Sequence, residues 1–242
     1  MKIVVIGDIH GRDWWYNAID NESDADLFVF LGDYVTTHEG ISSDQQCAIC
    51  EDILNFKAEN LDKVILLRGN HDNQMLGYAW AECSGYDSKV ASWLTGIKDR
   101  FLSLTQWIYI HDDMIFSHAG ISTEWMRYYK INDVTEINSI EPCPTFGFTS
   151  NRFSDYCGES SIQPCTWIRP TTLARYLVPE YTQIVGHTPI THIRNLKESD
   201  PPFEIKENLW CCDTNLTEYL VINIDNETKE KNFVIKPFKT EI

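Results

Sequence analysis

The sequence predicts an α/β protein built on a largely parallel β-sheet. Three short apolar runs, at residues 2–6, 27–31 and 64–67, have the length and apolar composition of strands buried on both faces, and the first is rich in β-branched residues. The stretches between these runs are long enough for helices, and the resulting strand–helix alternation is typical of βαβ units. In such sheets a ligand binds beyond the carboxyl ends of the strands, so those ends are where a site is expected.

Two helices are expected between the first three strands, at residues 12–20 and 42–58. The second has Ser42 or Ser43 as its N-cap. Further elements follow in chain order: a helix at 88–103, a hairpin of strands 107–110 and 114–117, a helix at 171–178 and a strand at 181–185. The tail alternates within 209–212, 216–224 and 232–235, which predicts two or three antiparallel strands.

Residues 130–165 differ from the rest of the chain, with scattered Pro, Gly, Cys, Ser and aromatic residues and little periodicity. We interpret them as an irregular insert that could cover a site as a lid. No linker or internal repeat is evident, so a single domain over residues 1–242 is the simplest prediction.

The charge balance excludes some classes of partner. The chain has 242 residues and a formal net charge of −16, which disfavours binding to nucleic acid or to an anionic membrane. No run approaches the roughly 18 apolar residues that a membrane span needs, and the first residues do not form a signal peptide. We therefore expect a cytoplasmic protein; the oligomeric state cannot be predicted.

The eight cysteines are expected to be free thiols, because no secretory signal accompanies them. Cys47 and Cys50 have the spacing of a zinc or redox pair. No second pair or suitably spaced histidine accompanies them, and they lie within a helical pattern. Buried thiols on one side of that helix are the better interpretation.

The first candidate site is the stretch from Gly7 to Gly11, directly after the first strand. Asp8 and His10 would leave the edge of the sheet side by side, while the glycines allow a tight turn. A carboxylate with an imidazole suits manganese, iron or zinc. A strand-to-helix turn with an aspartate cap is the alternative, and this stretch alone does not decide between them.

The same design recurs at the ends of later strands, which favours the metal site. The recurring residues are Asp33, Asn70 with His71, His118, and His187. A dinuclear site needs one anionic ligand between two cations about 3.5–4 Å apart, and Asp33 is the natural bridge. The first cation would be held by Asp8, His10 and Asp33. The second would be held by Asp33, Asn70, His118 and His187.

Together these motifs resemble the phosphoprotein-phosphatase branch of the calcineurin-like metallophosphoesterases. The matching stretches are Gly-Asp-Ile-His-Gly at 7–11, Gly-Asp-Tyr-Val at 32–35, Arg-Gly-Asn-His-Asp at 68–72, His-Ala-Gly at 118–120 and Gly-His-Thr-Pro at 186–189. Small bacterial and phage serine/threonine phosphatases and symmetrical diadenosine-tetraphosphate hydrolases are the most similar groups. The resemblance implies a four-layered αββα sandwich and the same ligand set. It also implies that His71 is the general acid.

The second motif departs from the family pattern. The Asp that usually orients the acid histidine is replaced by Thr36, and the phosphate-binding Arg by Thr37. His38 or Glu39 could substitute for the missing carboxylate. Arg169 is expected to be catalytic as the remaining phosphate-binding arginine, whereas Arg68 is expected to be structural.

Other residues are weaker candidates for the pocket. Arg12 is a further candidate for the missing phosphate grip. The substrate-binding residues are expected to be Arg169, Asn70 and Tyr34. The segment around Phe146, Phe148 and Arg152 could also shape a pocket, whereas His111 and His192 are expected to be ordinary surface histidines.

The predicted function is a phosphate monoesterase that uses two divalent cations to activate water. We expect Mn²⁺, with iron, zinc or nickel as alternatives, and a phosphoprotein or a small phosphorylated metabolite as substrate. A phosphodiesterase or dinucleoside-polyphosphate hydrolase is the alternative enzyme. A non-catalytic scaffold that kept the fold is the alternative of another class; the intact ligand set argues against it.

Overall fold

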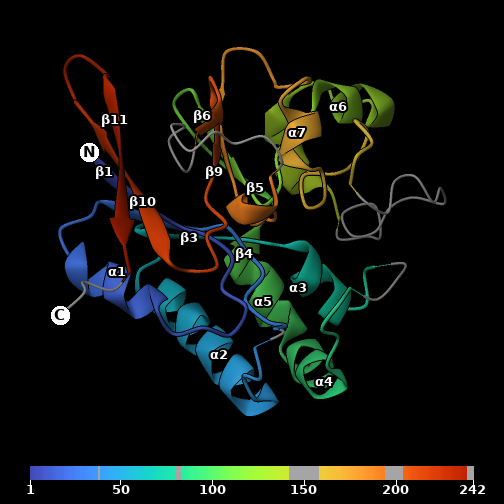
Figure 1. Cartoon of the computed structure of the whole chain (residues 1–242). Helices are drawn as coiled ribbons and strands as arrows, with labels where there is room; N and C mark the ends of the chain where they lie inside the picture. The colour runs from blue at the N-terminus through green and yellow to red at the C-terminus, as the bar shows by residue number, and fades with distance from the viewer. Residues whose placement is uncertain (38, 80–82, 142–157, 194–203, 239–242) are drawn as a thin grey trace.

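Two β-sheets lie face to face at the centre of the molecule, with helices on both outer sides (Figure 1). This arrangement comes from a computed structural model that describes residues 1–37, 39–79, 83–141, 158–193 and 204–238. The predicted insert at 130–165 lies partly outside these residues. Its described part includes the short 3-10 helix η1 (Val134–Ser139), and its role as a lid stays a prediction.

The first sheet contains the three strands that the sequence predicts as buried and parallel. Its order is β11-β10-β1-β2-β3-β4. The bounds are β1 Lys2–Ile6, β2 Leu27–Phe30, β3 Val64–Leu67, β4 Thr105–Gln106, β10 Glu218–Ile224 and β11 Lys231–Pro237. Strands β1 to β4 are parallel, and β10 joins β1 antiparallel with Val4 opposite Val221. The carboxyl ends of β1, β2 and β3 therefore meet at one edge.

The second sheet has the order β5-β6-β7-β9-β8. Its strands are β5 Ile108–His111, β6 Met114–Ser117, β7 Thr182–Val185, β8 Glu204–Lys206 and β9 Leu209–Cys211. The predicted hairpin is present as β5 and β6, while β6, β7 and β9 run parallel. The loops after β6, β7 and β9 therefore leave this sheet at a common edge as well.

The helices complete a four-layered αββα sandwich, as the motif resemblance implied. Helices beside the first sheet are α1 Trp15–Asn21, α2 Ser43–Glu59, α3 Asn70–Met75, α4 Ser88–Gly96 and α5 Lys98–Leu104. Beside the second sheet lie α6 Thr123–Tyr129, α7 Pro170–Leu173 and the 3-10 helix η4 Ile190–His192. The chain is thus of the α/β class that the strand–helix alternation predicts.

The buried core follows these layers. Ile3 and Val29 of the first sheet, with Leu31 just after β2, pack with Phe116 and Ile184 of the second sheet, which fills the space between the sheets. The other face of the first sheet packs against the helices through a separate cluster that includes residues of α2, α4 and α5. Because β1 and β2 are covered on both faces, their sequences are apolar apart from Lys2 at the start of β1.

Several predicted boundaries differ from the structure for local reasons. The helix expected at 88–103 is two helices separated at Ile97, directly after Gly96, a poor helix former. The helix expected at 171–178 is only α7: turns follow it, and Leu177 pairs with Ser122 in an isolated antiparallel bridge. The N-cap of α2 is Ser42, whose hydroxyl accepts from the backbone N–H of Gln45.

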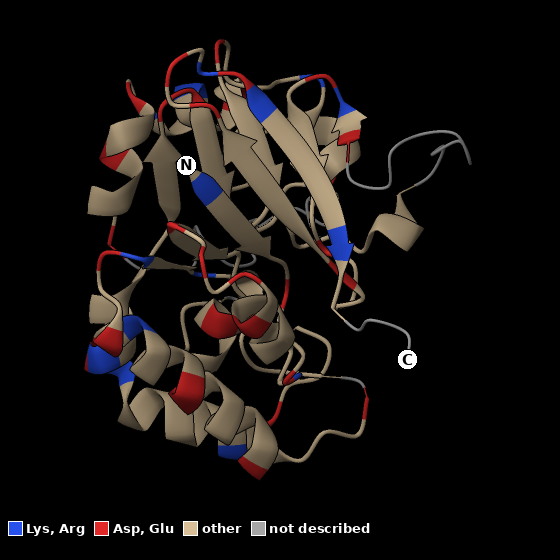
Figure 2. Ribbon diagram, turned by 90° about the vertical axis from the view of Figure 1, so that its left-hand side faces the viewer, with Lys and Arg blue, Asp and Glu red and all other residues tan. Residues whose placement is uncertain are grey.

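The surface and the cysteines agree with the predictions from composition. Asp and Glu positions are spread over helices and loops around both sheets (Figure 2). All six cysteines within the described ranges are free thiols, and Cys50 is buried in α2 with Cys47 partly exposed one turn away. Among the residues described, every helix is too short or too polar to cross a bilayer.

Candidate metal and active site

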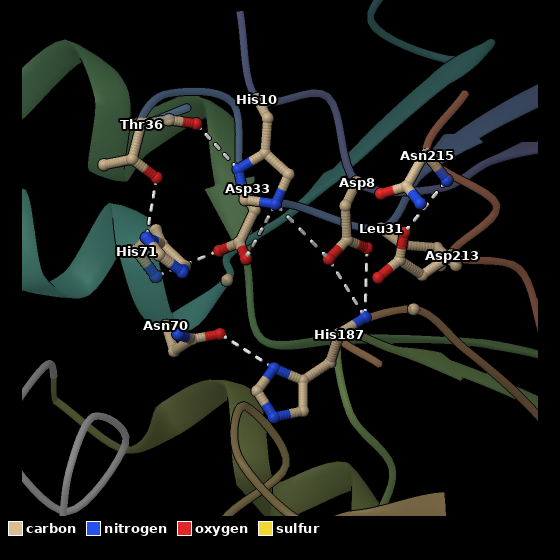
Figure 3. Close-up of polar contacts among 12 residues, drawn as sticks. Asp8, His10, Leu31, Asp33, Thr36, Asn70, His71, His187, Asp213 and Asn215 are labelled. Carbon is tan, nitrogen blue, oxygen red and sulfur yellow. Dashed lines mark hydrogen bonds and ion pairs between the residues drawn. The ribbon is translucent and has the colours of Figure 1, made fainter. Parts of the chain in front are cut away.

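The loops at the carboxyl ends of five strands bring the predicted ligands into one cluster (Figure 3). Asp8 and His10 follow β1, Asp33 follows β2, Asn70 and His71 follow β3, His118 follows β6, and His187 follows β7. The cluster opens into a cavity of about 550 Å³ lined by His10, Asp33, Asn70, His71 and His187 among others. Asp8 and His118 are buried, with 1% and 0% of their surface exposed.

Asp33 lies between the two predicted groups of ligands. Its Oδ2 atom is 3.9 Å from Nε2 of His10 and 3.4 Å from Nε2 of His118. Asp8 belongs to the first group, with Oδ2 at 4.0 Å from Nε2 of His10. Ligand atoms of Asp8, Asp33 and His118 all lie within 4.8 Å of one another, a spacing that can hold a cation.

The second group converges on the side-chain oxygen of Asn70. This Oδ1 atom is 2.9 Å from Nε2 of His118 and 2.9 Å from Nδ1 of His187. The Asn70 amide is oriented from its other end, because Nδ2 donates to Sγ of Cys83 at 3.5 Å. Its oxygen therefore faces the two imidazoles.

The three ligand histidines each have their outer ring nitrogen beside a backbone carbonyl. The contacts are His10 Nδ1 to Thr36 O at 2.8 Å, His118 Nδ1 to Leu31 O at 2.8 Å, and His187 Nε2 to Trp167 O at 3.1 Å. A carbonyl oxygen can only accept, so the hydrogen of the neutral ring lies on that outer nitrogen. The inner nitrogen of each ring then presents a lone pair to the cluster. Lone pairs, carboxylates and an amide oxygen facing one another are a donor set that fits divalent cations.

The buried carboxylates of the cluster favour positive charge beside them. Burial alone would lower the pKa of His118, but the carboxylates of Asp33 and Asp8 raise it to about 10. Burial, together with the neighbouring Asp213, raises the pKa of Asp8 well above its usual range. In the chain alone, protons supply the charge that cations would provide.

The loops that carry these ligands have unusual backbone geometry. His10, Asp33 and His187 have φ values of 49°, 52° and 66°, in the left-handed region that few residues other than glycine adopt. Gly69 and Gly186 leave room for the carboxylates. A Cβ atom at Gly69 would lie 2.0 Å from Oδ1 of Asp33, and one at Gly186 would lie 2.2 Å from Oδ1 of Asp8.

Asp72 holds the loop of Asp33 in place. Its buried carboxylate accepts the backbone N–H groups of Asp33 at 2.9 Å, Tyr34 at 3.0 Å and Gly69 at 2.8 Å. This role was missed from the sequence, although Asp72 belongs to the Arg-Gly-Asn-His-Asp motif. A carboxylate directly after His71, the histidine expected to be the general acid, was the available signal.

The acid candidate His71 has a hydroxyl partner in place of the usual carboxylate. Oγ1 of Thr36 lies 2.6 Å from Nδ1 of His71, while the Thr36 carbonyl is the acceptor for His10. The backbone N–H of Thr36 donates to Oε1 of Gln46 at 2.8 Å. Thr36 therefore gives His71 a hydrogen-bonding partner, although not the carboxylate that the family motif supplies.

The arginines take different positions. Arg169 lines the cavity, and its Nη1 donates to Oγ1 of Thr188 at 3.1 Å. Arg12 lines the same cavity. Arg68 is buried, with its guanidinium 3.9 Å from the centre of the Trp107 ring, a placement that agrees with the structural role expected for it.

The other residues weighed for the pocket have different outcomes. Tyr34 is 1% exposed and its hydroxyl donates to the Leu67 carbonyl at 2.8 Å, so its assignment to substrate binding is wrong. The segment around Phe146, Phe148 and Arg152 lies outside the described residues, as does His38. His192, expected to be an ordinary surface residue, lines the cavity.

Other residues of the cavity wall were not predicted. Asp213 follows β9, is 2% exposed, and accepts the backbone N–H of Asn215 at 3.3 Å. Trp167 and Cys83 also line the cavity. The signal for Asp213 was the same as for the ligands: an acidic residue directly after an apolar strand.

Comparison with known families agrees with the fold. The profile of the calcineurin-like phosphoesterases matches residues 1–218, so the chain belongs to that family. It is a phosphoesterase, a hydrolase that acts on phosphate ester bonds. A search of curated proteins gives no match.

Solved structures show the same fold at low sequence identity. A protein serine/threonine phosphatase from Saccharomyces cerevisiae with similarity to human phosphatase PP5 is 16% identical, with a TM-score of 0.61. The match covers 100% of this chain and 81% of that one. The cold-active protein-tyrosine phosphatase of a Shewanella species is 15% identical with a TM-score of 0.58, over 98% of this chain and 80% of that one.

Proposed function

We propose that the chain hydrolyses phosphate monoesters with two divalent cations bound in the ligand cluster. The observation that carries this proposal is the position of Asp33 between His10 and His118, at 3.9 and 3.4 Å. Asp8, His10 and Asp33 would hold one cation. Asp33, Asn70, His118 and His187 would hold the other. When bound, the cations supply a water activated at neutral pH and neutralise charge on the phosphate.

His71 is the proposed general acid. Its ring lies 5.2 Å from that of His10, centre to centre and edge to face, so it stands beside the first ligand group. Because Thr36 contacts Nδ1, Nε2 is the ring nitrogen that would transfer its proton to the leaving oxygen. A hydroxyl can donate or accept, whereas a carboxylate only accepts, so Thr36 stabilises the imidazolium less than an aspartate would.

Arg169 is the proposed binding residue for the phosphoryl oxygens. It projects into the cavity beside His187, close enough for its charge to add to burial in lowering the pKa of that histidine. A low pKa keeps His187 neutral, the state in which it can bind a metal. Mn²⁺ is the proposed metal, since carboxylate, amide oxygen and imidazole ligands suit it.

The substrate is proposed to be a phosphoprotein or a small phosphorylated metabolite. The cavity wall includes the carboxylate of Asp213, and Arg12 in that wall is already paired with Glu39, so little free positive charge is left for the extra phosphates of a dinucleoside polyphosphate. The similarity of fold to protein phosphatases supports a monoester but does not select among such substrates.

A substrate panel tests this proposal. The manganese-loaded protein is assayed with p-nitrophenyl phosphate, bis(p-nitrophenyl) phosphate, a phosphoserine peptide and diadenosine tetraphosphate. We expect kcat/KM on p-nitrophenyl phosphate to exceed that on the bis-ester at least tenfold. Preference for the bis-ester would indicate a phosphodiesterase, and preference for the dinucleotide would indicate a polyphosphate hydrolase. Either outcome contradicts the monoesterase proposal.

A further inference from the structure

Arg12 and Glu39 form a paired unit in the wall of the cavity. Nε of Arg12 donates to Oε2 of Glu39 at 2.9 Å, and Nη2 donates to Oε1 at 2.7 Å. Both residues line the cavity, and the two parallel bonds occupy one edge of the guanidinium. Glu39 therefore fixes the plane of the Arg12 head group.

The remaining donor of Arg12 has no acceptor in the described part of the chain. Arg12 is 9% exposed, and its Nη1 atom is buried without a hydrogen-bond partner there. A buried N–H of a charged group that lacks a hydrogen-bond acceptor costs free energy. The site is therefore incomplete without an acceptor. A phosphoryl oxygen is an acceptor that a guanidinium binds well.

Arg12 and Arg169 approach the ligand cluster from different loops. Arg12 lies two residues after His10, in the loop that follows β1, and Glu39 lies in the loop that follows β2. Arg169 precedes α7 and contacts Thr188 in the loop after β7. Among the described residues that line the cavity, these two arginines are the only Lys or Arg side chains.

We propose that Arg12, oriented by Glu39, is a second substrate-binding arginine that takes the phosphoryl oxygens together with Arg169. The inference rests on the proposed phosphomonoesterase function. In this arrangement Arg12 supplies the positive charge that the family's arginine would supply at position 37, where this chain has Thr37. Glu39 is a positioning residue in this arrangement, because it contacts Arg12 and not the phosphate. A purely structural role for the pair is the competing explanation.

Binding of inorganic phosphate separates these explanations. The dissociation constant of phosphate is measured by calorimetry on manganese-loaded wild type, Arg12→Gln, Arg12→Lys and Arg100→Gln. Arg100 is the matched control, since it pairs with Glu51 on α2 and does not line the cavity. Metal content and thermal midpoint are recorded for each variant.

We expect Arg12→Gln to weaken phosphate binding about tenfold to hundredfold, the loss typical of a charged hydrogen bond. KM for p-nitrophenyl phosphate should rise with it, with a smaller fall in kcat. Arg12→Lys keeps a cation for Glu39 but loses the planar fork, so it should fold normally and still bind phosphate several-fold more weakly. Arg100→Gln should match wild type in phosphate affinity and metal content.

Wild-type phosphate affinity in Arg12→Lys and in any folded Arg12→Gln overturns the inference and leaves a structural pair. The proposed function fails in a different way, namely if wild type hydrolyses none of the phosphate monoesters. An Arg12-dependent phosphate affinity in such a protein would support the binding role without the reaction.

Discussion

The hydroxyl of Thr36 lies 2.6 Å from Nδ1 of His71, at the position where the family motif leads one to expect a carboxylate. The same residue accepts the Nδ1–H of His10 through its carbonyl at 2.8 Å. One threonine thus orients both a ligand histidine and the proposed acid. Its φ of 71° and the hydrogen bond from its backbone N–H to Oε1 of Gln46 fix the loop in which it lies.

Removing this hydroxyl tests its role directly. Thr36→Val keeps the shape of the side chain but cannot bond to Nδ1 of His71, so we expect kcat on a phosphoserine peptide to fall about tenfold or more. The fall on p-nitrophenyl phosphate should be smaller, because p-nitrophenolate leaves without protonation. Steady-state kinetics on both substrates measures the difference, with Thr36→Ser as the control that should retain activity. Equal losses on the two substrates would argue against an orienting role.

Substitution of the acid itself should separate catalysis from metal binding. His71→Asn removes the proton donor but none of the six proposed metal ligands. We expect metal content close to wild type and turnover lowered about 10²- to 10⁴-fold. Elemental analysis and kinetics on the same preparation provide the two measurements. Loss of metal in this variant would mean that His71 is a ligand and not the acid.

A buried carboxylate away from the cavity should make stability depend on pH. Glu22 is 1% exposed, accepts the hydroxyl of Tyr219 at 3.0 Å, and pairs with Lys2 and Lys236. Burial opposes ionisation, but these partners lower its pKa below the usual value of 4.5. The folded-state pKa is thus below the unfolded one, so this stabilisation is present above pH 4.5 and is lost as pH falls through the folded-state pKa.

We therefore expect Glu22→Gln to lower the free energy of unfolding by about 1–2 kcal/mol at pH 7. The difference from wild type should shrink as the pH is lowered through the acidic range. Urea unfolding at a series of pH values measures it. The control Glu51→Gln removes a more exposed carboxylate that pairs with Arg100 and should cost less than about 1 kcal/mol. A Glu22→Gln difference that is independent of pH would contradict the linkage.

Much of the fold could be predicted from local patterns. The strand at 64–67 has the predicted bounds, because its apolar run ends there at a glycine-containing turn. The edge strand β8 and the two-residue strand β4 were not predicted, since short, half-exposed strands have no strong period. The parallel pairing of β9 with β7 depends on chain crossovers that the tail sequence does not encode locally.

The ligands were easier to predict than the residues that hold them. Asp8, Asp33 and His118 directly follow apolar strands, so their meeting at a sheet edge follows from topology. The contacts of Asp72 depend on backbone N–H groups from two loops, and the contact of Thr36 with His71 depends on a left-handed backbone. Tyr34 was assigned to the pocket because it follows Asp33, but its ring turns into the core against Phe101.

The metal content of Asp33→Asn tests the proposed two-cation centre most directly. Asp33 would contribute charge to both cations, whereas Asp44→Asn removes an exposed carboxylate of α2 that pairs with Lys89 and serves as the control. After loading with manganese and removal of free ion, elemental analysis should find two ions per chain in wild type and in Asp44→Asn. We predict fewer than one in Asp33→Asn, with activity lost in parallel. Two ions per chain in a folded Asp33→Asn would contradict a centre bridged by Asp33.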